Sequence, residues 1–203
     1  RLDRRRAMKR VSIVTLGCKT NQFESAGMSE SLVKEGFEIV PFGEEADICV
    51  INTCTVTART DAESRRLIRR AHRRNPSAVI VVTGCYAQLS PELFREFPGV
   101  SLIIGNSEKR DLVELLRVAD VKPTVRVADI SRERRADPLL LETFAEHTRA
   151  FLQVQNGCDS WCSYCIVPHV RGRSRSVSPD RALEGMRTFA ARGFREVALT
   201  GIH

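Results

Sequence analysis

Apolar runs alternate with helical patterning along the first 120 residues of the chain. The apolar runs are short, rich in β-branched residues and located at 11–17, 37–41, 46–53, 78–84 and 102–105. Continuous apolar runs of this length are typical of parallel strands buried on both faces. Stretches with helical patterning lie between and after them, at 21–34, 57–74, 91–97 and 107–118. The alternation predicts an α/β fold, an open parallel sheet covered by helices, with Ser107 capping the last helix.

A second pattern follows a charged segment that has no clear period. RAFLQVQNG, from Arg149, alternates apolar and polar residues and predicts a strand, which a Cys-rich and Arg-rich loop follows. Ser178 and Pro179 predict the start of a helix that runs to Gly193. REVALTG, at 195–201, then predicts another parallel strand. This β-α-β order is that of a parallel sheet in which strands and helices alternate.

These patterns divide the chain into a first domain at 9–127, a linker at 128–148 and the start of a second domain at 149–203. A single β-α-β unit cannot close a sheet or cover its own edges. We therefore expect the chain to be a piece of a larger protein, with Met8 as its natural start, and to be inactive by itself.

Composition narrows the class of protein. The chain has 203 residues, 42% of them apolar, so it is not a disordered or low-complexity chain. It has no apolar run of the roughly 18 residues that cross a bilayer and no secretory signal, so we expect a cytoplasmic protein without a membrane partner. The net charge of +7 favours an anionic partner such as nucleic acid. Arginines concentrate on one predicted helix and form a broad basic face there, which is interpreted as a contact surface for nucleic-acid phosphates; a solvated face is the alternative. They are at positions 59, 65, 66, 69, 70, 73 and 74.

Three of the seven cysteines lie within eight residues. Cys158, Cys162 and Cys165 form a C-x3-C-x2-C motif, and three thiols cannot all pair with one another. A 4Fe-4S cluster normally has four Cys ligands, so three would leave one iron open to a small molecule. A zinc site of these cysteines and His169 is an alternative, as are incidental thiols.

The other triplet is dispersed. Cys18, Cys54 and Cys85 each follow a predicted strand, and the carboxyl ends of parallel strands share one edge of a sheet. We therefore expect the three to meet and to hold a second cluster with an open iron; buried core thiols are the alternative. Cys49 lies inside a predicted strand and is interpreted as an inert buried thiol.

The C-x3-C-x2-C motif, with Tyr164 just before its last Cys, resembles the signature of radical S-adenosylmethionine enzymes. The resemblance implies that the second domain is the first β-α-β of a truncated radical S-adenosylmethionine (β/α) partial barrel. It also implies that the open iron binds S-adenosyl-L-methionine and that reductive cleavage yields a 5′-deoxyadenosyl radical. The motifs LGCKTNQFES, INTCTVT and TGCYAQ resemble the N-terminal domain of methylthiotransferases, which insert a methylthio group into an unactivated C–H bond. In that family the dispersed cysteines hold the cluster that supplies sulfur.

Within the family, LGCKTNQ is most similar to the branch that methylthiolates C2 of N6-threonylcarbamoyladenosine beside the tRNA anticodon. The resemblance thus implies two 4Fe-4S clusters, S-adenosyl-L-methionine, a tRNA substrate and an electron donor such as flavodoxin or ferredoxin. The other branches, which act on isopentenyladenosine or on a ribosomal protein, remain open. An alternative of another class is a zinc-stabilised nucleic-acid-binding module.

A few further residues are candidates for the site. Arg171, Arg173 and Arg175 follow the cluster loop and are candidates to clamp the S-adenosylmethionine carboxylate or tRNA phosphate; a solvated basic loop is the alternative. Gly201 stands where the superfamily has a glycine turn that binds the methionine amino group, although LTGIH departs from the usual GGE pattern. Asn21 and Gln22 follow Cys18 and are expected to cap the first helix and to shape the cluster loop.

Overall fold

The computed structural model describes residues 9–119, 123–134, 136 and 149–202. The expectations for Met8 and for most of the linker, at 137–148, lie outside the described residues. The domain boundaries themselves remain a prediction.

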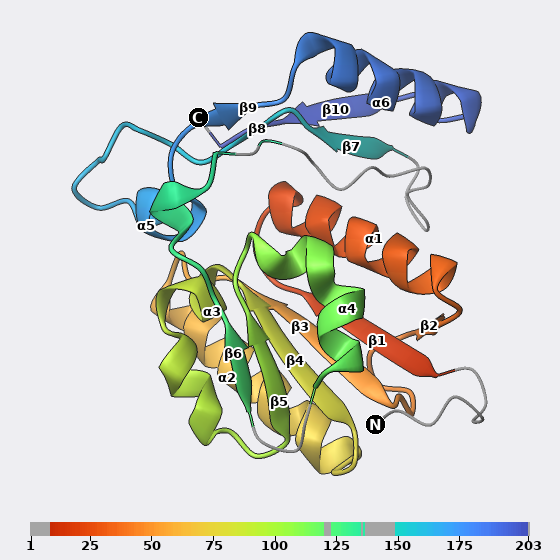
Figure 1. Cartoon of the computed structure of the whole chain (residues 1–203), viewed down its shortest axis with the longest axis vertical. Coiled ribbons are helices and arrows are strands. Elements are labelled where there is room, and N and C mark those ends of the chain that lie inside the picture. Colours follow the sequence, from red (N-terminus) through yellow and green to blue (C-terminus); the bar gives the residue numbers. More distant parts are fainter. Residues whose placement is uncertain (1–8, 120–122, 135, 137–148, 203) are drawn as a thin grey trace.

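A parallel sheet forms the body of the first part of the chain, which we define as residues 9–127 (Figure 1). Its strands occur in the order β2-β1-β3-β4-β5-β6, and every neighbouring pair is parallel. They are β1 (Arg10–Thr15), β2 (Glu38–Val40), β3 (Ile48–Thr53), β4 (Val79–Gly84), β5 (Val100–Ile104) and β6 (Thr124–Arg126). The predicted α/β class is therefore confirmed. The sequence analysis missed β6, a short edge strand without a buried residue.

Helices bury both faces of this sheet. Helices α1 (Lys19–Lys34) and α4 (Leu112–Arg117) pack on one face, and α2 (Ala58–Arg74) and α3 (Cys85–Leu89) pack on the other. Strand β3 shows why: Ile48 and Val50 face one core while Cys49 and Ile51 face the other. Buried strands of this kind need apolar residues at every position.

Two short segments differ from the sequence prediction. The expected 91–97 helix is a 3-10 helix, η1 (Pro91–Glu96). The expected 107–118 helix divides into a 3-10 turn, η2 (Glu108–Asp111), and α4, and the Ser107 side chain makes no capping hydrogen bond. The capping prediction for Ser107 is therefore wrong: Ser107 already has helical backbone angles, whereas an N-cap is extended.

The second part of the chain, residues 149–202, contains a parallel pair of strands, β7 (Ala150–Gln153) and β10 (Val197–Thr200). Helix α6 (Pro179–Ala191) lies between them in sequence. Ser178 caps α6 by accepting from the Arg181 amide, as its sequence predicts. The single strand expected from Arg149 is instead two strands, because β8 (Gln155–Asn156) pairs antiparallel with β9 (Arg175–Ser176). This part also contains the short helix α5 (Val167–Arg171), and a 3-10 turn, η3 (Ile130–Arg132), lies within the segment predicted as a linker.

Helix α1 lies between the two parts of the chain (Figure 1). Its Met28 and Leu32 pack on the large sheet, whereas its Phe23 packs against Phe151 and Phe189 of the second part. One helix thus contributes to both cores, so the position of each part depends on the same element.

Within the described part of the chain, none of the helices combines the length and the apolar character needed to span a bilayer.

Substitution of Gly84 tests how closely the backbone packs at the end of β4, just before Cys85. The Gly84 φ of +96° and ψ of −169° belong to a region that only glycine occupies readily. A Cβ there would overlap the Thr53 carbonyl oxygen and lie 2.6 Å from Asn52 Oδ1. We expect Gly84→Ala to lower the free energy of unfolding by about 3 kcal/mol or more, from strain plus overpacking.

The matched control is Gly36→Ala, since Gly36 also has a positive φ but a Cβ there meets nothing within 4 Å. Gly36→Ala should lower the free energy of unfolding by only about 1 kcal/mol. Urea denaturation measures both, and equal losses would contradict the close packing described at Gly84.

Candidate functional site

Three cysteines from three strand ends meet at one cavity. Strands β1, β3 and β4 are neighbours in the sheet, and Cys18, Cys54 and Cys85 follow their carboxyl ends. All three line a single cavity of about 430 Å³. Cys54 and Cys85 are buried and Cys18 is exposed. The structure thus brings the dispersed triplet together, at the edge of the sheet where ligands bind in open α/β folds.

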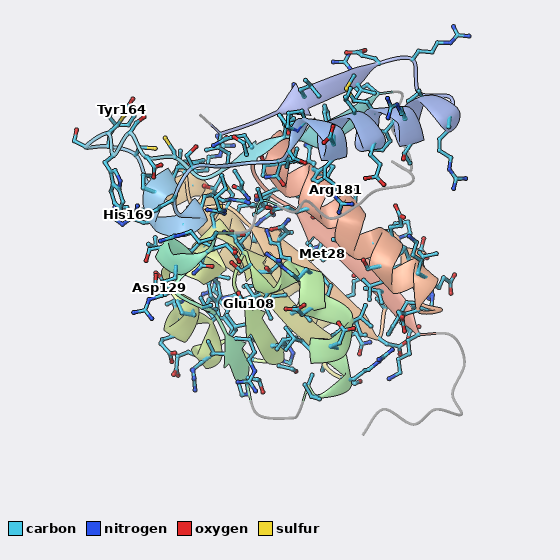
Figure 2. The ribbon with its side chains drawn as sticks, turned by 45° about the horizontal axis from the view of Figure 1, so that its top comes forward. Met28, Glu108, Asp129, Tyr164, His169 and Arg181 are labelled. Carbon is cyan, nitrogen blue, oxygen red and sulfur yellow. The ribbon has the colours of Figure 1, made fainter. Side chains whose placement is uncertain are left out.

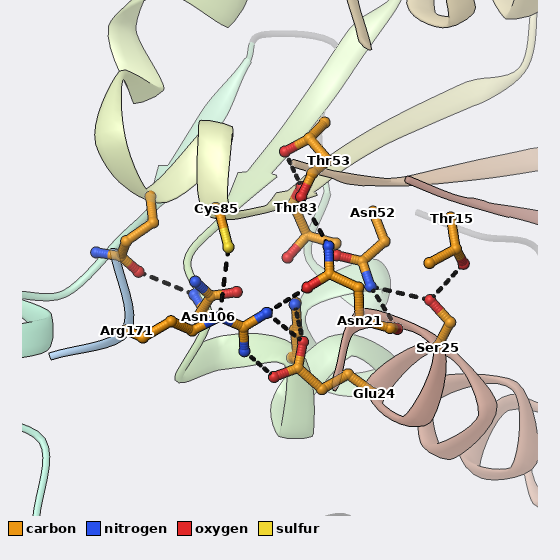
Figure 3. Close-up of polar contacts among 12 residues, drawn as sticks. Thr15, Asn21, Glu24, Ser25, Asn52, Thr53, Thr83, Cys85, Asn106 and Arg171 are labelled. Atoms are coloured by element: carbon orange, nitrogen blue, oxygen red, sulfur yellow. Dashed lines mark hydrogen bonds and ion pairs between the residues drawn. The ribbon is translucent and has the colours of Figure 1, made fainter. Parts of the chain in front are cut away.

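A buried polar network fixes the loops that carry these cysteines (Figure 3). Asn21 donates through Nδ2 to the carbonyl oxygens of Leu16, at 2.7 Å, and Thr53, at 3.1 Å, which precede Cys18 and Cys54. Asn52 donates to the Asn21 carbonyl at 3.0 Å. The prediction that Asn21 caps α1 is wrong: its side chain instead links two strand ends, and Cys18 occupies the N-cap position.

A buried charge cluster lies beside this network. Arg171 of α5 is only 2% exposed, and its guanidinium bonds to the Glu24 carboxylate and the Asn21 side-chain oxygen. Lys109, which is 3% exposed, also bonds to Glu24. Arg171 Nε donates to Cys85 Sγ at 3.3 Å. Two cations therefore surround one carboxylate, and one of them contacts a cysteine sulfur.

Burial and charge shift the pKa values of these groups. Burial raises the pKa of Cys54, and the Cys85 and Cys18 sulfurs add to the effect. Burial alone would raise the pKa of Glu24, but Arg171 and Lys109 hold it below its ordinary value. For Arg171, the charges of Cys85 and Glu24 outweigh burial and raise its pKa. Burial thus favours the neutral thiol of Cys54 unless positive charge lies close to its sulfur, as a bound metal centre would provide.

The second part of the chain supplies the opposite wall of the cavity. Val170 and Arg171 of α5 and Thr200 and Gly201 at the end of β10 line it together with the three cysteines. Gln155 joins the residues after β10 to the start of the cysteine loop, since its Oε1 accepts from the Ile202 amide at 2.7 Å and its Nε2 donates to the Gly157 carbonyl at 2.7 Å. Gly201, a predicted cofactor-binding residue, thus lies at the cavity.

The clustered cysteines lie on the loop that precedes α5. Cys158 and Cys165 are partly exposed and Cys162 is exposed. The Cys158 amide donates to the Gly172 carbonyl at 3.0 Å, which closes the base of the loop, and the Cys165 amide donates to the Cys162 carbonyl at 2.9 Å. These three residues do not line the cavity of the dispersed triplet; the loop opens beside it.

Two other predicted cofactor residues lie away from the cavity. Tyr164 is 90% exposed, and Figure 2 shows it at the outer end of the cysteine loop. Arg173 is exposed and does not line the cavity. Arg175 is buried and donates to the carbonyl oxygens of Arg171 and Arg173, so a solvated basic loop does not describe it. Roles for Tyr164 and Arg173 remain predictions.

The arginine-rich helix α2 is less free than its sequence indicates. Arg65 donates to the Tyr86 hydroxyl at 2.7 Å, and Arg66 pairs with Glu63. Arg69 lies over the ring of Phe97, and Arg70 lies over the ring of Phe42. The arginines of α2 that remain exposed and that no contact named here engages are Arg59, Arg73 and Arg74. The basic surface available to an anionic partner is therefore smaller than the predicted face.

The donor set at the cavity fits an iron–sulfur cluster. Cys18, Cys54 and Cys85 provide three soft sulfur donors, and among the described residues that line the cavity none has a carboxylate or an imidazole. Among the described residues, no three His, Cys, Asp or Glu side chains are arranged around a single ion. A four-iron cluster is wider than one ion, so its thiolates lie farther apart. On the loop, Cys158, Cys162 and Cys165 are donors of the same type, while the His169 ring packs edge-on against Trp161.

Sequence reasoning did not find the charge cluster. Arg171 was interpreted as a clamp for a carboxylate or phosphate, and neither Glu24 nor Lys109 was singled out. Arg171 lies 147 positions from Glu24, and Lys109 lies 85 positions from it. No local pattern signals a pairing over such separations.

Comparison with known proteins gives related chains over nearly the whole length. Residues 10–105 match the family described as "Uncharacterized protein family UPF0004". The chain is 39% identical over 194 residues to a threonylcarbamoyladenosine tRNA methylthiotransferase MtaB of Aquifex aeolicus, covering 95% of this chain and 47% of that protein. The same-named protein of Bacillus subtilis is 38% identical over 97% of this chain and 44% of its own.

A ribosomal protein uS12 methylthiotransferase RimO of Desulfitobacterium hafniense is 34% identical, over 94% of this chain and 44% of that protein. The chain spans about half the length of the curated relatives it matches.

Glu24→Gln tests the buried charge cluster. The change keeps the shape of the side chain but leaves Arg171 and Lys109 without their shared anion. Removing one partner of a buried ion pair costs about 3–5 kcal/mol, so we expect the free energy of unfolding at pH 7 to fall by about that amount. Glu44→Gln, in an exposed pair with Arg10, is the control and should cost less than about 1 kcal/mol. Denaturant titration decides, and similar losses in both variants would contradict the cluster's stabilising role.

Proposed function

We propose that this member of the methylthiotransferase family is a radical S-adenosylmethionine enzyme. Its proposed reaction is methylthiolation of C2 of N6-threonylcarbamoyladenosine in tRNA. One observation carries the proposal. Cys18, Cys54 and Cys85, far apart in sequence, line the same cavity as Arg171 and Gly201 of the second part of the chain. A cavity lined by three cysteines thus adjoins the part of the chain that carries the C-x3-C-x2-C motif.

Each cysteine triplet holds one 4Fe-4S cluster in this proposal. When bound, a cluster with an open iron supplies either sulfur for transfer or the electron that cleaves S-adenosyl-L-methionine to a radical. Adenine C2–H is too inert for acid–base chemistry, so the cofactors carry the difficult step and the protein orients them. Val56, Val170 and Leu199 line the cavity and give it apolar walls; Val170 is buried, whereas Val56 and Leu199 are exposed.

The motif LGCKTNQ around Cys18 and the relatives both favour tRNA as the substrate. Relatives whose names specify threonylcarbamoyladenosine tRNA are up to 39% identical, and the one named for ribosomal protein uS12 is 34% identical. The exposed arginines of α2 provide positive charge for phosphate contacts. Methylthiolation of a ribosomal protein is the second candidate, supported by that relative.

Iron analysis tests the two-cluster site. We expect the intact protein, purified without oxygen, to contain roughly eight iron and eight sulfide per chain, as two four-iron clusters require. Cys54→Ala and Cys162→Ala should each retain about half of the iron, because each removes a ligand of one cluster. Cys49→Ala is the matched control: Cys49 is buried in β3, away from the cavity, and should retain all of it. Stoichiometric zinc without visible absorption would instead support the nucleic-acid-binding module.

Nucleoside mass spectrometry tests the substrate. Cells that lack the gene should lose the 2-methylthio derivative of N6-threonylcarbamoyladenosine and accumulate the unmodified nucleoside. The native gene should restore the derivative, whereas Cys18→Ala should not, because its cluster would lack one of three ligands. Unchanged tRNA together with loss of a methylthio group from a ribosomal protein would contradict the proposed substrate and favour the second candidate.

A further inference from the structure

Arg171 contacts a cysteine of the other part of the chain. Its Nε–H group donates to Cys85 Sγ at 3.3 Å, and both residues are buried. Among the described residues, this bond is the direct polar contact recorded between the second part and the sulfur atoms of the dispersed triplet. A guanidinium donor to a sulfur is a charge-assisted hydrogen bond, which is stronger than a neutral one.

The neighbours of Arg171 fix the direction of this bond. Glu24 and Asn21 bind the two terminal nitrogens of the guanidinium, so the remaining Nε–H is directed at Cys85 (Figure 3). Asn106 also donates to the carbonyl of Val170 at 2.7 Å, which holds α5 against the first part of the chain. Because the planar fork of Arg has a fixed geometry, three partners leave it little freedom to turn.

The Glu24–Arg171 pair by itself carries no net charge, and Lys109 adds a further positive charge beside Glu24; the charges are not equally placed. The guanidinium contacts the cysteine sulfur, whereas Glu24 is not among the residues that line the cavity. Hydrogen bonds to sulfur and nearby positive charge stabilise the more negative, reduced state of an iron–sulfur centre. An electrically neutral pair can therefore still favour reduction of a centre bound to Cys85.

We propose that Arg171 is a positioning residue that sets the reduction potential of the centre bound by Cys18, Cys54 and Cys85, through its hydrogen bond to the Cys85 sulfur. This inference rests on the proposed function, because it requires a cluster at these cysteines. Arg171 also ends the short helix that follows the second cysteine loop, at Cys158 to Cys165. The same residue thus joins the loop of one triplet to a ligand of the other.

A variant of the intact protein with Cys158, Cys162 and Cys165 replaced by Ala isolates the centre in question. Within it, Arg171→Gln combined with Glu24→Gln removes one charge of each sign, so the formal net charge of the cluster is unchanged and Lys109 is its remaining cation. Arg171→Lys keeps the charge but removes the Nε–H group. Arg173→Gln is the control, since Arg173 is exposed and outside the cavity.

The readout is the midpoint potential from an EPR-monitored redox titration, with iron content measured on the same samples. We expect both Arg171 variants to shift the midpoint to more negative values, while Arg173→Gln leaves it unchanged. A purely structural role would lower stability without moving the midpoint. The second Arg171 variant supplies the measurement if the first does not fold or binds no iron.

Unchanged midpoints in the Arg171 variants that retain about four iron per chain would overturn the inference and leave the proposed function intact. Absence of iron from the triple-Ala background itself would overturn the proposed cluster at Cys18, Cys54 and Cys85, and the inference with it. Equal shifts in the Arg173 control would also overturn the specific role of Arg171.

Discussion

The ion pair between Arg171 and Glu24 determines how the two parts of this chain are joined. Burying such charges costs several kcal/mol per ion unless every donor finds a partner. Here the guanidinium bonds Glu24, Asn21 and Cys85, and Lys109 supplies a second cation to the carboxylate. Any displacement of α5 would leave these charges buried and unpaired, so the geometry of the cavity is strongly specified.

The strand ends provide the other half of the site. Parallel strands end at a common edge, and the Asn21 and Asn52 side chains hold adjacent ends of that edge together. Gly84 allows the chain to turn directly from β4 into Cys85, in a backbone conformation that side chains other than glycine rarely adopt. A backbone conformation that favours glycine and a buried polar network therefore occur together at the strand ends that carry the three cysteines.

The sequence was sufficient to predict the sheet because its strands are continuous apolar runs, and it placed Cys18, Cys54 and Cys85 at one edge because strand direction follows from the alternation with helices. It failed where the signal is short or nonlocal. Strand β6 has three residues without a buried face, so periodicity cannot identify it. The burial of Arg171 depends on partners distant along the chain, and Asn21 after Cys18 has the residue type of a cap yet links strand ends instead.

The proposed function requires the loop of Cys158, Cys162 and Cys165, held by Arg171, to lie beside the cavity of Cys18, Cys54 and Cys85, so that the two iron–sulfur centres would be neighbours. EPR spectroscopy of the fully reduced, intact protein measures this directly, because two nearby paramagnetic centres split or broaden each other's signals. The account predicts a spectrum with magnetic interaction, which disappears when either triplet is replaced by alanine. A spectrum equal to the sum of the two single-centre spectra would contradict it.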